Sequence, residues 1–216
     1  IMNLNNPEKS YWEYVDVMAY NLTSYGRGKK VLLMGLGGGT LYKRLVKEGF
    51  EVDVVEMDQR IVQVAKDFFE IDDISVTVDD ARHYMATCRE SYDIIIYDIF
   101  HAETPPAHAM TVEAFELVKT KLSPNGILVI NYMGFISGEK GKSARAIYKT
   151  LQFANFNTQL LATEGEEAYR NLLFIAGKKK LEPIKNIIHP SINEQDIVMK
   201  DIEVLTDDQP NLEHLY

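Results

Sequence analysis

The sequence predicts an α/β fold in which helices flank a seven-stranded mixed sheet. Apolar, strand-like runs alternate with helical patterns through the first five predicted strands, which favours parallel pairing with right-handed crossovers. The last two predicted strands are joined only by residues 164–167, which makes them antiparallel hairpin partners. In the run 30–40, an apolar strand breaks into four glycines before a helical pattern begins.

Composition limits the class of protein. The chain has 216 residues, of which 46% are hydrophobic, and this is enough for one domain with a sizeable core. Its formal net charge of −9 argues against a nucleic-acid backbone or an anionic membrane as the main partner. The single cysteine, Cys88, excludes an internal disulfide framework. No run approaches the roughly 18 apolar residues of a membrane span and no secretory signal is visible, so we expect a cytoplasmic protein, with a homodimer left open.

The remaining elements follow in order along the chain. The run 92–98 has a continuous apolar core, which is typical of a central strand covered on both faces. Thr111 is suited to cap a helix over 112–121. A helix over 58–69 is predicted with these side chains inward: Ile61, Val62, Ala65, Phe68 and Phe69. Further strands are predicted over 51–56, 74–78, 127–132, 157–163 and 168–177, and further helices over 41–48 and 143–153.

The glycines of the first turn can bring the backbone close to a ligand. Gly35, Gly37 and Gly39 allow a tight turn with no Cβ atom in the way, although four glycines can also form only a tight loop. The next strand changes this balance because it ends in Glu56, 21 positions after Gly35. An acid about 20 residues after such a turn can accept hydrogen bonds from both ribose hydroxyls. Together these features predict a nucleoside site at the carboxyl ends of the strands.

Two further acids follow strand ends and should line the same rim. Asp80, beside the small Ala81, suits the edge of an adenine ring, but an aspartate there is equally suited to cap a helix. Asp98 follows the central apolar strand, so its carboxylate should be partly desolvated at the cleft. A carboxylate in that position can bind an ammonium group and accept the proton that an amine must lose before it attacks. The alternative is that Asp98 only orients a ligand or caps the loop.

The loop over residues 99–110 contains His101, Glu103 and His108, which raises the question of a metal site. Their spacing matches no strong ligand pattern, so we expect no metal. A mobile gate over the pocket is the better interpretation of this loop.

We expect three segments along the chain. Residues 1–26 form an N-terminal helical segment, residues 27–177 a nucleoside-binding domain, and residues 178–216 a C-terminal tail that packs on or near the cleft. In the first segment, a helix over 5–25 carries an apolar stripe whose spacing indicates core packing. The stripe consists of Tyr11, Tyr14, Val15, Met18 and Leu22.

These motifs resemble the polyamine aminopropyltransferase (spermidine synthase-like) family, a branch of the class I S-adenosylmethionine-dependent methyltransferase fold. The similarity spans about residues 11–177 and returns at 206–210. The matching pieces are Gly35–Leu41, Val55–Asp58, Asp80–Arg82, Tyr92–Asp98 and Leu122–Leu128. The resemblance implies a Rossmann-like methyltransferase fold and a transferase of polyamine biosynthesis.

The resemblance also implies roles for individual residues. The glycine turn and Glu56 would hold the ribose and the amino-acid part of the donor, Asp80 and Ala81 the adenine, and Asp98 would be the proton acceptor. The implied donor-binding set is Gly35, Gly37, Gly39, Glu56, Met57, Asp80 and Ala81. The implied reaction moves an aminopropyl group from decarboxylated S-adenosylmethionine, the co-substrate, to a small-molecule amine. It leaves methylthioadenosine and uses no metal.

Three departures from the family pattern bear on the substrate. The family turn carries an acid where this chain has Gly38, and the family loop carries a second acid where this chain has His101. On the substrate loop Glu103, and in the tail Asp207 or Asp208, are candidates to replace the lost charge. The family's small N-terminal β-domain is not found in this sequence.

Two other functions stay open on the same fold. A methyltransferase would use S-adenosylmethionine with its carboxylate intact, and Gly38 mildly favours it because an acid at that position would repel the carboxylate. A non-catalytic nucleoside-binding homologue is favoured by the loss of the second loop acid. An NAD-dependent dehydrogenase is more distant, since Thr40 replaces the third glycine of that fingerprint.

Overall fold

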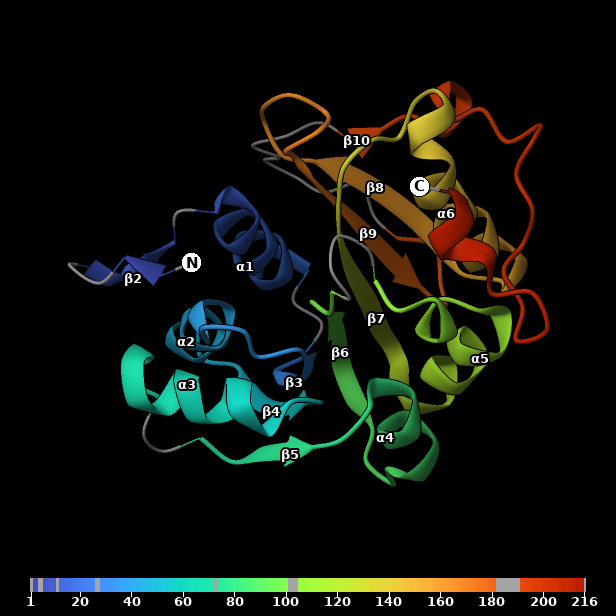
Figure 1. Cartoon of the computed structure of the whole chain (residues 1–216). Helices are drawn as coiled ribbons and strands as arrows, with labels where there is room; N and C mark the ends of the chain where they lie inside the picture. The colour runs from blue at the N-terminus through green and yellow to red at the C-terminus, as the bar shows by residue number, and fades with distance from the viewer. Residues whose placement is uncertain are drawn as a thin grey trace.

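A computed structural model describes residues 2–3, 6–10, 12–25, 28–71, 74–100, 105–181 and 191–215. In this part of the chain, the main sheet has strand order β10-β8-β9-β7-β6-β3-β4-β5 (Figure 1). Five strands are parallel: β3 (Lys30–Met34), β4 (Glu51–Glu56), β5 (Val76–Val78), β6 (Tyr92–Tyr97) and β7 (Leu122–Met133). β9 (Asn171–Gly177) lies between β7 and β8 (Asn157–Ala162) and is antiparallel to both. The predicted mixed sheet with an antiparallel C-terminal hairpin is confirmed.

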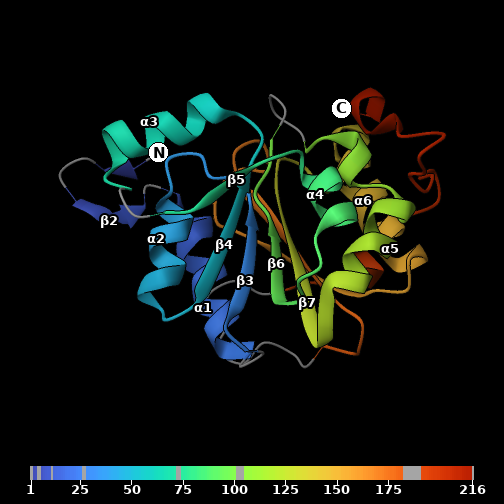
Figure 2. The ribbon, with the colours of Figure 1, turned by 90° about the horizontal axis from the view of Figure 1, so that it is seen from below.

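Helices cover both faces of the sheet (Figure 2). One face carries α1 (Glu13–Tyr25), α2 (Thr40–Lys47) and α3 (Gln59–Phe69), and the other carries α4 (Ala81–Thr87), α5 (Val112–Lys121) and α6 (Lys142–Phe153). Alternate residues of β3 serve the two resulting cores: Val31 and Leu33 pack with α1–α3, whereas Leu32 and Met34 pack with α4–α6. A strand buried on both sides needs apolar residues at every position, which explains the continuous runs of β3 and β6.

The parallel register brings the functional strand ends to one edge of the sheet. Met34 pairs with Val55 of β4 and with Tyr97 of β6, so the next residues on the three strands are Gly35, Glu56 and Asp98. Gly35 has φ +92°, and a Cβ atom there would lie 2.2 Å from the carbonyl oxygen of Asp98. Only glycine fits where the turn after β3 passes the end of β6.

The N-terminal helix is shorter than the sequence predicted. Residues 6–10 form strand β2 (Asn6–Ser10), which pairs with β1 (Met2–Asn3), and the helix begins only at Glu13. The prediction of a helix from residue 5 was therefore wrong. Residues 6–10 contain no large apolar side chain, so no packing could stabilise a helical turn there.

The α3 helix buries fewer side chains than predicted. Val62 and Ala65 are buried, but Ile61 is 36% and Phe68 67% exposed, so the inward assignment of these two was wrong. Ile61 lies about 70° and Phe68 about 90° around the helix from the middle of the buried pair, so α3 covers the sheet with a single narrow stripe. Asp58 caps the helix by accepting a hydrogen bond from the Arg60 amide at 2.8 Å.

Smaller differences concern the strands. The third strand is limited to Val76–Val78, and β7 begins at Leu122 rather than at Ile127. Residues 123–126 form an irregularity in the pairing of β7 with β6, where the register moves from Tyr92 opposite Leu122 to Ile94 opposite Ile127. An eighth strand of two residues, β10 (Ser191–Ile192), pairs with β8 at the sheet edge and was not predicted.

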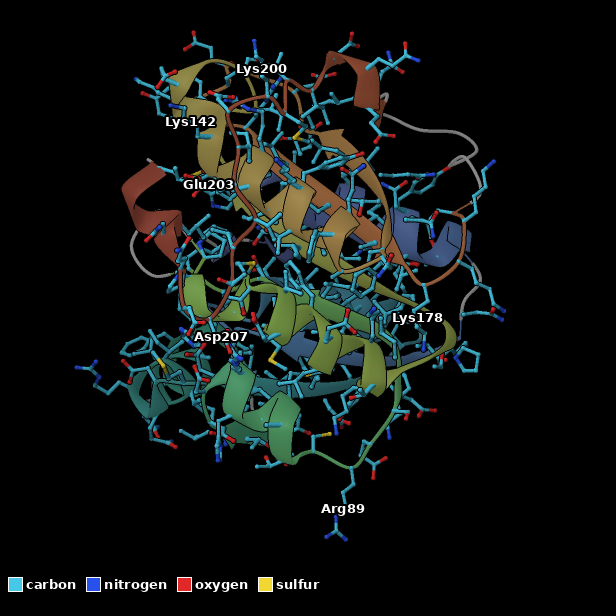
Figure 3. All side chains as sticks on the ribbon, turned by 90° about the vertical axis from the view of Figure 1, so that its right-hand side faces the viewer. Arg89, Lys142, Lys178, Lys200, Glu203 and Asp207 are labelled. Carbon is cyan, nitrogen blue, oxygen red and sulfur yellow. The ribbon has the colours of Figure 1, made fainter. Side chains whose placement is uncertain are left out.

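The C-terminal segment 191–215 lies along α5 and α6, on the face shown in Figure 3. The Val112 amide donates to the Leu205 carbonyl at 2.9 Å, and the Leu205 amide donates to the Thr150 hydroxyl at 3.0 Å. Short 3₁₀ helices are η1 (Ala107–Ala109), η2 (Glu139–Gly141), η3 (Glu194–Asp196) and η4 (Asn211–Leu215). None of the described helices is long and apolar enough to cross a membrane. The division into three segments remains a prediction.

Candidate functional site

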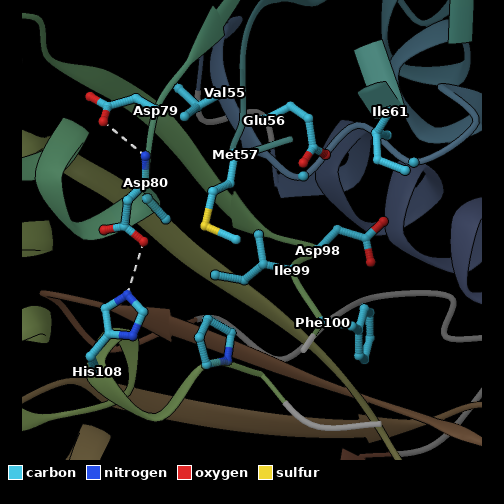
Figure 4. Close-up of a pocket in the computed structure, with 14 residues that line it drawn as sticks. Val55, Glu56, Met57, Ile61, Asp79, Asp80, Asp98, Ile99, Phe100 and His108 are labelled. Carbon is cyan, nitrogen blue, oxygen red and sulfur yellow. Dashed lines mark hydrogen bonds and ion pairs between the residues drawn. The ribbon is translucent and has the colours of Figure 1, made fainter. Parts of the chain in front are cut away.

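A cavity of about 330 Å³ opens at the carboxyl ends of β3, β4 and β6 (Figure 4). This is the edge where open α/β sheets bind ligands, and the volume is that of a small-molecule site. The described residues that line it are Gly35, Gly37, Val55, Glu56, Met57, Ile61, Asp79, Asp80, Ala81, Asp98, Ile99, Phe100, Pro106 and His108. Four of them are acids, and none of them is lysine or arginine.

Most of the residues predicted for the site lie in this cavity. Its lining includes the predicted Gly35, Gly37, Glu56, Met57, Asp80, Ala81 and Asp98. Gly39 is absent from the lining: it is buried at φ +73°, and a Cβ atom there would lie 1.7 Å from the Ile71 side chain. Gly39 therefore shapes the start of α2 behind the cavity, a packing requirement that local sequence cannot reveal. His101 and Glu103, predicted for the substrate loop, and Tyr11 of the predicted stripe lie outside the described residues.

Glu56 ties the end of β4 to the glycine turn. One carboxylate oxygen accepts from the Leu36 amide at 2.9 Å and the other from the Asp58 amide at 3.0 Å. Each carboxylate oxygen has two lone pairs, so both can still accept a hydroxyl hydrogen from a ligand in the cavity. The side chain is thus fixed in one orientation before any ligand arrives.

Asp98 is held by hydrogen-bond donors from two other elements. The Tyr14 hydroxyl of α1 donates to its Oδ2 at 3.0 Å, and the Asn131 amide of β7 donates to its Oδ1 at 2.7 Å. Burial raises the pKa of Asp98 above its usual value, while these two bonds act in the opposite direction. Burial and the Asp98 charge raise the pKa of Tyr14, so its phenol stays protonated and donates. The result is a desolvated carboxylate with one oriented donor on each oxygen.

Asp80 caps helix α4 and also contacts His108. Its Oδ1 accepts from the Arg82 amide at 2.9 Å and from the His83 amide at 3.0 Å, so the helix-cap alternative is confirmed. Its Oδ2 lies 2.9 Å from the His108 Nε2 atom (Figure 4). Burial alone would raise the pKa of Asp80, but the His83 amide and His108 hold it below its usual value. The helix cap uses only the Oδ1 atom, so the contact between Asp80 and adenine remains a prediction for the Oδ2 atom.

A second polar cluster fixes the far side of the loop that carries His108. The Arg82 guanidinium forms an ion pair with Asp207, and it also donates to the His108 carbonyl oxygen at 2.8 Å. The Thr111 hydroxyl donates to Asp207 at 2.7 Å. Arg82 lowers the pKa of Asp207. Asp207 is not among the residues that line the cavity, and its charge is already paired with Arg82, so it does not replace the acid missing from the loop.

Sequence reasoning missed the two donors to Asp98. Tyr14 was assigned to the core stripe of α1, whose Val15, Met18 and Leu22 are indeed buried. Asn131 is the single amide in the apolar part of β7 and is 1% exposed. A buried polar side chain requires a hydrogen-bond partner, so an asparagine within an apolar strand could have indicated a polar neighbour such as Asp98. Within the described residues, no group of three or more His, Cys, Asp or Glu side chains is arranged to hold a metal ion.

Comparison with known proteins gives the same assignment from sequence. The model of the spermine/spermidine synthase domain matches residues 8–181. A probable polyamine aminopropyl transferase from Bifidobacterium longum is 35% identical over 133 residues, which cover 59% of this chain and 29% of that protein. A polyamine aminopropyltransferase from Vibrio vulnificus is 30% identical over 69% of this chain and 52% of its own length. An N-terminal histidine N-methyltransferase from Emericella nidulans is 25% identical over 77% of this chain and 31% of its own length. The chain therefore spans about half or less of these relatives.

Solved structures support the fold. A probable spermidine synthase from Corynebacterium glutamicum superposes with a TM-score of 0.76 at 19% identity, over 93% of this chain and 82% of that one. Human methyltransferase-like protein 13 superposes with a TM-score of 0.63 at 24% identity, over 79% of this chain and 83% of that one. The two neighbours show that the predicted methyltransferase-like architecture is correct. Since the family model covers most of the sequence, the chain belongs to the spermine/spermidine synthase domain family.

Proposed function

We propose that this chain transfers an aminopropyl group from decarboxylated S-adenosylmethionine to a small-molecule amine, with Asp98 as the proton acceptor. The observation that carries the proposal is one acid-lined cavity in which Asp98 is desolvated and held by two donors. Membership of the family supports the reaction class.

The nucleoside part of the donor would lie along the strand ends. Glu56 would accept from the ribose hydroxyls, Gly35 and Gly37 would let the backbone approach the donor tail, and Met57 would contact the ring system. Asp80 and Ala81 would flank the adenine. In this arrangement the exocyclic amine would donate to the second lone pair of the Asp80 Oδ2 atom, beside the bond to His108.

Asp98 would act on the acceptor. It would bind the ammonium form of the amine and take one proton, which frees the nitrogen lone pair. The nitrogen then attacks the aminopropyl carbon next to the sulfonium. The carbon–sulfur bond breaks, and its electron pair stays on sulfur in methylthioadenosine. A raised pKa is suited to this task because it makes Asp98 a stronger base than an exposed aspartate.

The charge of the lining bears on the donor's carboxylation state. Four acids and no lysine or arginine line the described part of the cavity. A donor that has lost its carboxylate carries only positive charge and is attracted to this lining, whereas the carboxylate of S-adenosylmethionine has no cationic side chain to meet there. Two unit charges about 4 Å apart interact by about 4 kcal/mol at an effective dielectric near 20. This difference favours the decarboxylated donor.

Calorimetry and product analysis test the proposal. The protein is titrated with decarboxylated S-adenosylmethionine, S-adenosylmethionine and methylthioadenosine, and then incubated with the decarboxylated donor and a series of linear diamines. We expect binding of the decarboxylated donor and release of methylthioadenosine, and we expect Asp98→Asn to keep donor binding but lose turnover. Absence of binding by all three nucleosides would remove the proposal.

A second candidate is methyl transfer from S-adenosylmethionine. Gly38 favours it, because the acid that holds the donor amine in the family pattern is missing. The N-methyltransferase relative also supports it at low identity. A competition experiment decides: if S-adenosylmethionine displaces the decarboxylated donor at equal concentration, methyl transfer is the better assignment.

A further inference from the structure

A buried chain of amides leads away from Asp98 into the sheet. Asn131 on β7 donates to the Asp98 Oδ1 atom at 2.7 Å, and Asn171 on β9 donates to the Asn131 Oδ1 atom at 2.9 Å. Asn131 is 1% and Asn171 6% exposed. The two strands are antiparallel neighbours in which Asn131 lies opposite Leu173, so Asn171 is the diagonal neighbour of Asn131. Asn171 itself is outside the cavity lining.

The donor at Asn171 decides which end of the Asn131 amide faces Asp98. An asparagine side chain has an accepting oxygen at one end and a donating NH₂ group at the other. When Asn171 donates to the oxygen, the NH₂ group is the end left for Asp98, and an ionised carboxylate can only accept. The backbone of Asn171 is fixed in turn by Thr163. The backbone amide of Asn171 donates to the Thr163 hydroxyl at 2.8 Å, and its backbone carbonyl accepts from the Thr163 backbone amide at 2.9 Å.

We propose that Asn171 is a positioning residue: through Asn131 it keeps the Asp98 carboxylate oriented and ionised. The inference rests on the proposed function, in which Asp98 is the proton acceptor. Asn171 lies on β9, separated from β6 by β7 and outside the cavity lining, and would influence proton transfer without touching either substrate.

The surroundings of Asp98 make such a donor necessary. From α1 the Tyr14 hydroxyl faces it, from β7 Asn131, and across the shared cavity lie the carboxylates of Glu56 and Asp80. Burial disfavours a charge on Asp98, and no cationic side chain lines the described part of the cavity to offset this. Burial raises the pKa of Asp98, and the Asn131 bond lowers it again. An Asn131 amide turned the other way would present its oxygen to Asp98 and stabilise the protonated acid instead.

Two substitutions of Asn171 test the orientation. Asn171→Leu removes the donor, so Asn131 can turn freely. Asn171→Asp has almost the same shape but offers an acceptor, so it draws the NH₂ group of Asn131 away from Asp98. Asn21→Leu is a matched control: Asn21 is also buried, at 3% exposure, but its amide donates to the Val17 carbonyl within α1.

The readout is the ¹³C NMR titration of the Asp98 carboxyl carbon, assigned by its loss in Asp98→Asn. We expect the pKa of Asp98 to rise by about one pH unit in Asn171→Leu and by at least as much in Asn171→Asp, and to stay unchanged in Asn21→Leu. Thermal melts identify any variant that fails to fold. If Asn171→Leu fails to fold, the nearly isosteric Asn171→Asp still provides the test. In the folded variants, an Asp98 pKa within about 0.2 pH unit of the unsubstituted protein would overturn the proposal.

Kinetics separate this proposal from the proposed function. With an active enzyme, the acid limb of the kcat profile should move to higher pH in both Asn171 variants, while the KM for the donor stays within about two-fold because the donor-binding strands are untouched. The NMR titration needs no turnover. If no donor and amine react, the proposed function fails while the positioning role of Asn171 is still decided by the Asp98 titration.

Discussion

Replacing Tyr14 with phenylalanine removes one oxygen atom that donates to Asp98 and leaves the ring in place. The lost bond spans 3.0 Å from the Tyr14 hydroxyl to the Asp98 Oδ2 atom. A hydrogen bond to a charged group contributes about 1.5–3 kcal/mol, and the bond stabilises only the ionised form here. Since one pKa unit corresponds to about 1.36 kcal/mol, the pKa of Asp98 should rise by about one to two pH units. Below the original pKa of Asp98, the transfer rate should fall by about 10- to 100-fold, and by less between the original and the new pKa.

The same substitution changes the pH dependence of stability, and the sign follows from proton uptake. Because burial already raises the pKa of Asp98, the folded protein holds this proton more tightly than the unfolded chain. Stability therefore falls as the pH rises from the usual aspartate value of 3.8 through the folded pKa, and it is constant above that. In Tyr14→Phe the falling region extends to higher pH, so the loss of stability should be larger at neutral pH than at about pH 4.

Two measurements check this reasoning: the pH profile of the transfer rate, and urea unfolding across the same pH range. Tyr148→Phe is the control, because Tyr148 is a buried tyrosine whose hydroxyl also donates a hydrogen bond, to the Thr158 carbonyl, on the opposite face of the sheet. We expect the control to lose some stability equally at every pH. An unchanged acid limb in Tyr14→Phe would refute the assignment of its hydroxyl as a donor to the ionised base.

Three further predictions concern the same edge of the sheet. Asp98→Asn should remove the fall in stability between the usual aspartate value of 3.8 and the raised pKa of Asp98, measured by urea unfolding, because the group with the raised pKa is gone. Gly35→Ala should lower the free energy of unfolding by about 3 kcal/mol or more, since the new Cβ atom would lie 2.2 Å from the Asp98 carbonyl oxygen and the backbone has φ +92°. His108→Ala should raise the pKa of Asp80, because the bond to His108 lowers it; acid unfolding should then begin at higher pH, and an NMR titration of Asp80 gives the shift directly.

The acids at the strand ends could be predicted because their placement is local. Each follows directly after an apolar strand, and parallel strands end at the same edge, so Glu56 and Asp98 share a cavity with the glycine turn. The same local reasoning gave the caps at Asp80 and Thr111, since an Ncap needs only the amides of its own helix.

The partners of those acids could not be predicted, because they come from distant parts of the chain. Tyr14 is 84 residues and Asn131 is 33 residues from Asp98. The spacing of Tyr14 with its neighbours on α1 is the same for a packed ring and for a ring whose hydroxyl reaches the site. Arg82 and Asp207 are separated by 125 residues, and each belongs to a motif that the sequence showed without showing that the two meet.

Asp98 and the glycine turn after β3 are joined by backbone atoms, and under the proposed function this has a consequence for specificity. The Asp98 amide donates to the Met34 carbonyl at 2.9 Å, and the Asp98 carbonyl leaves room for only a hydrogen atom at Gly35. The distance from the glycine turn to Asp98 is therefore set by backbone atoms and not by side chains that could be substituted. The side chains of Tyr14 and Asn131 influence the ionisation and the orientation of the Asp98 carboxylate, because both donate hydrogen bonds to it. Under the proposed function, the loop after Asp98 could differ with the acceptor while the nucleoside and the reacting carbon stay in register with Asp98.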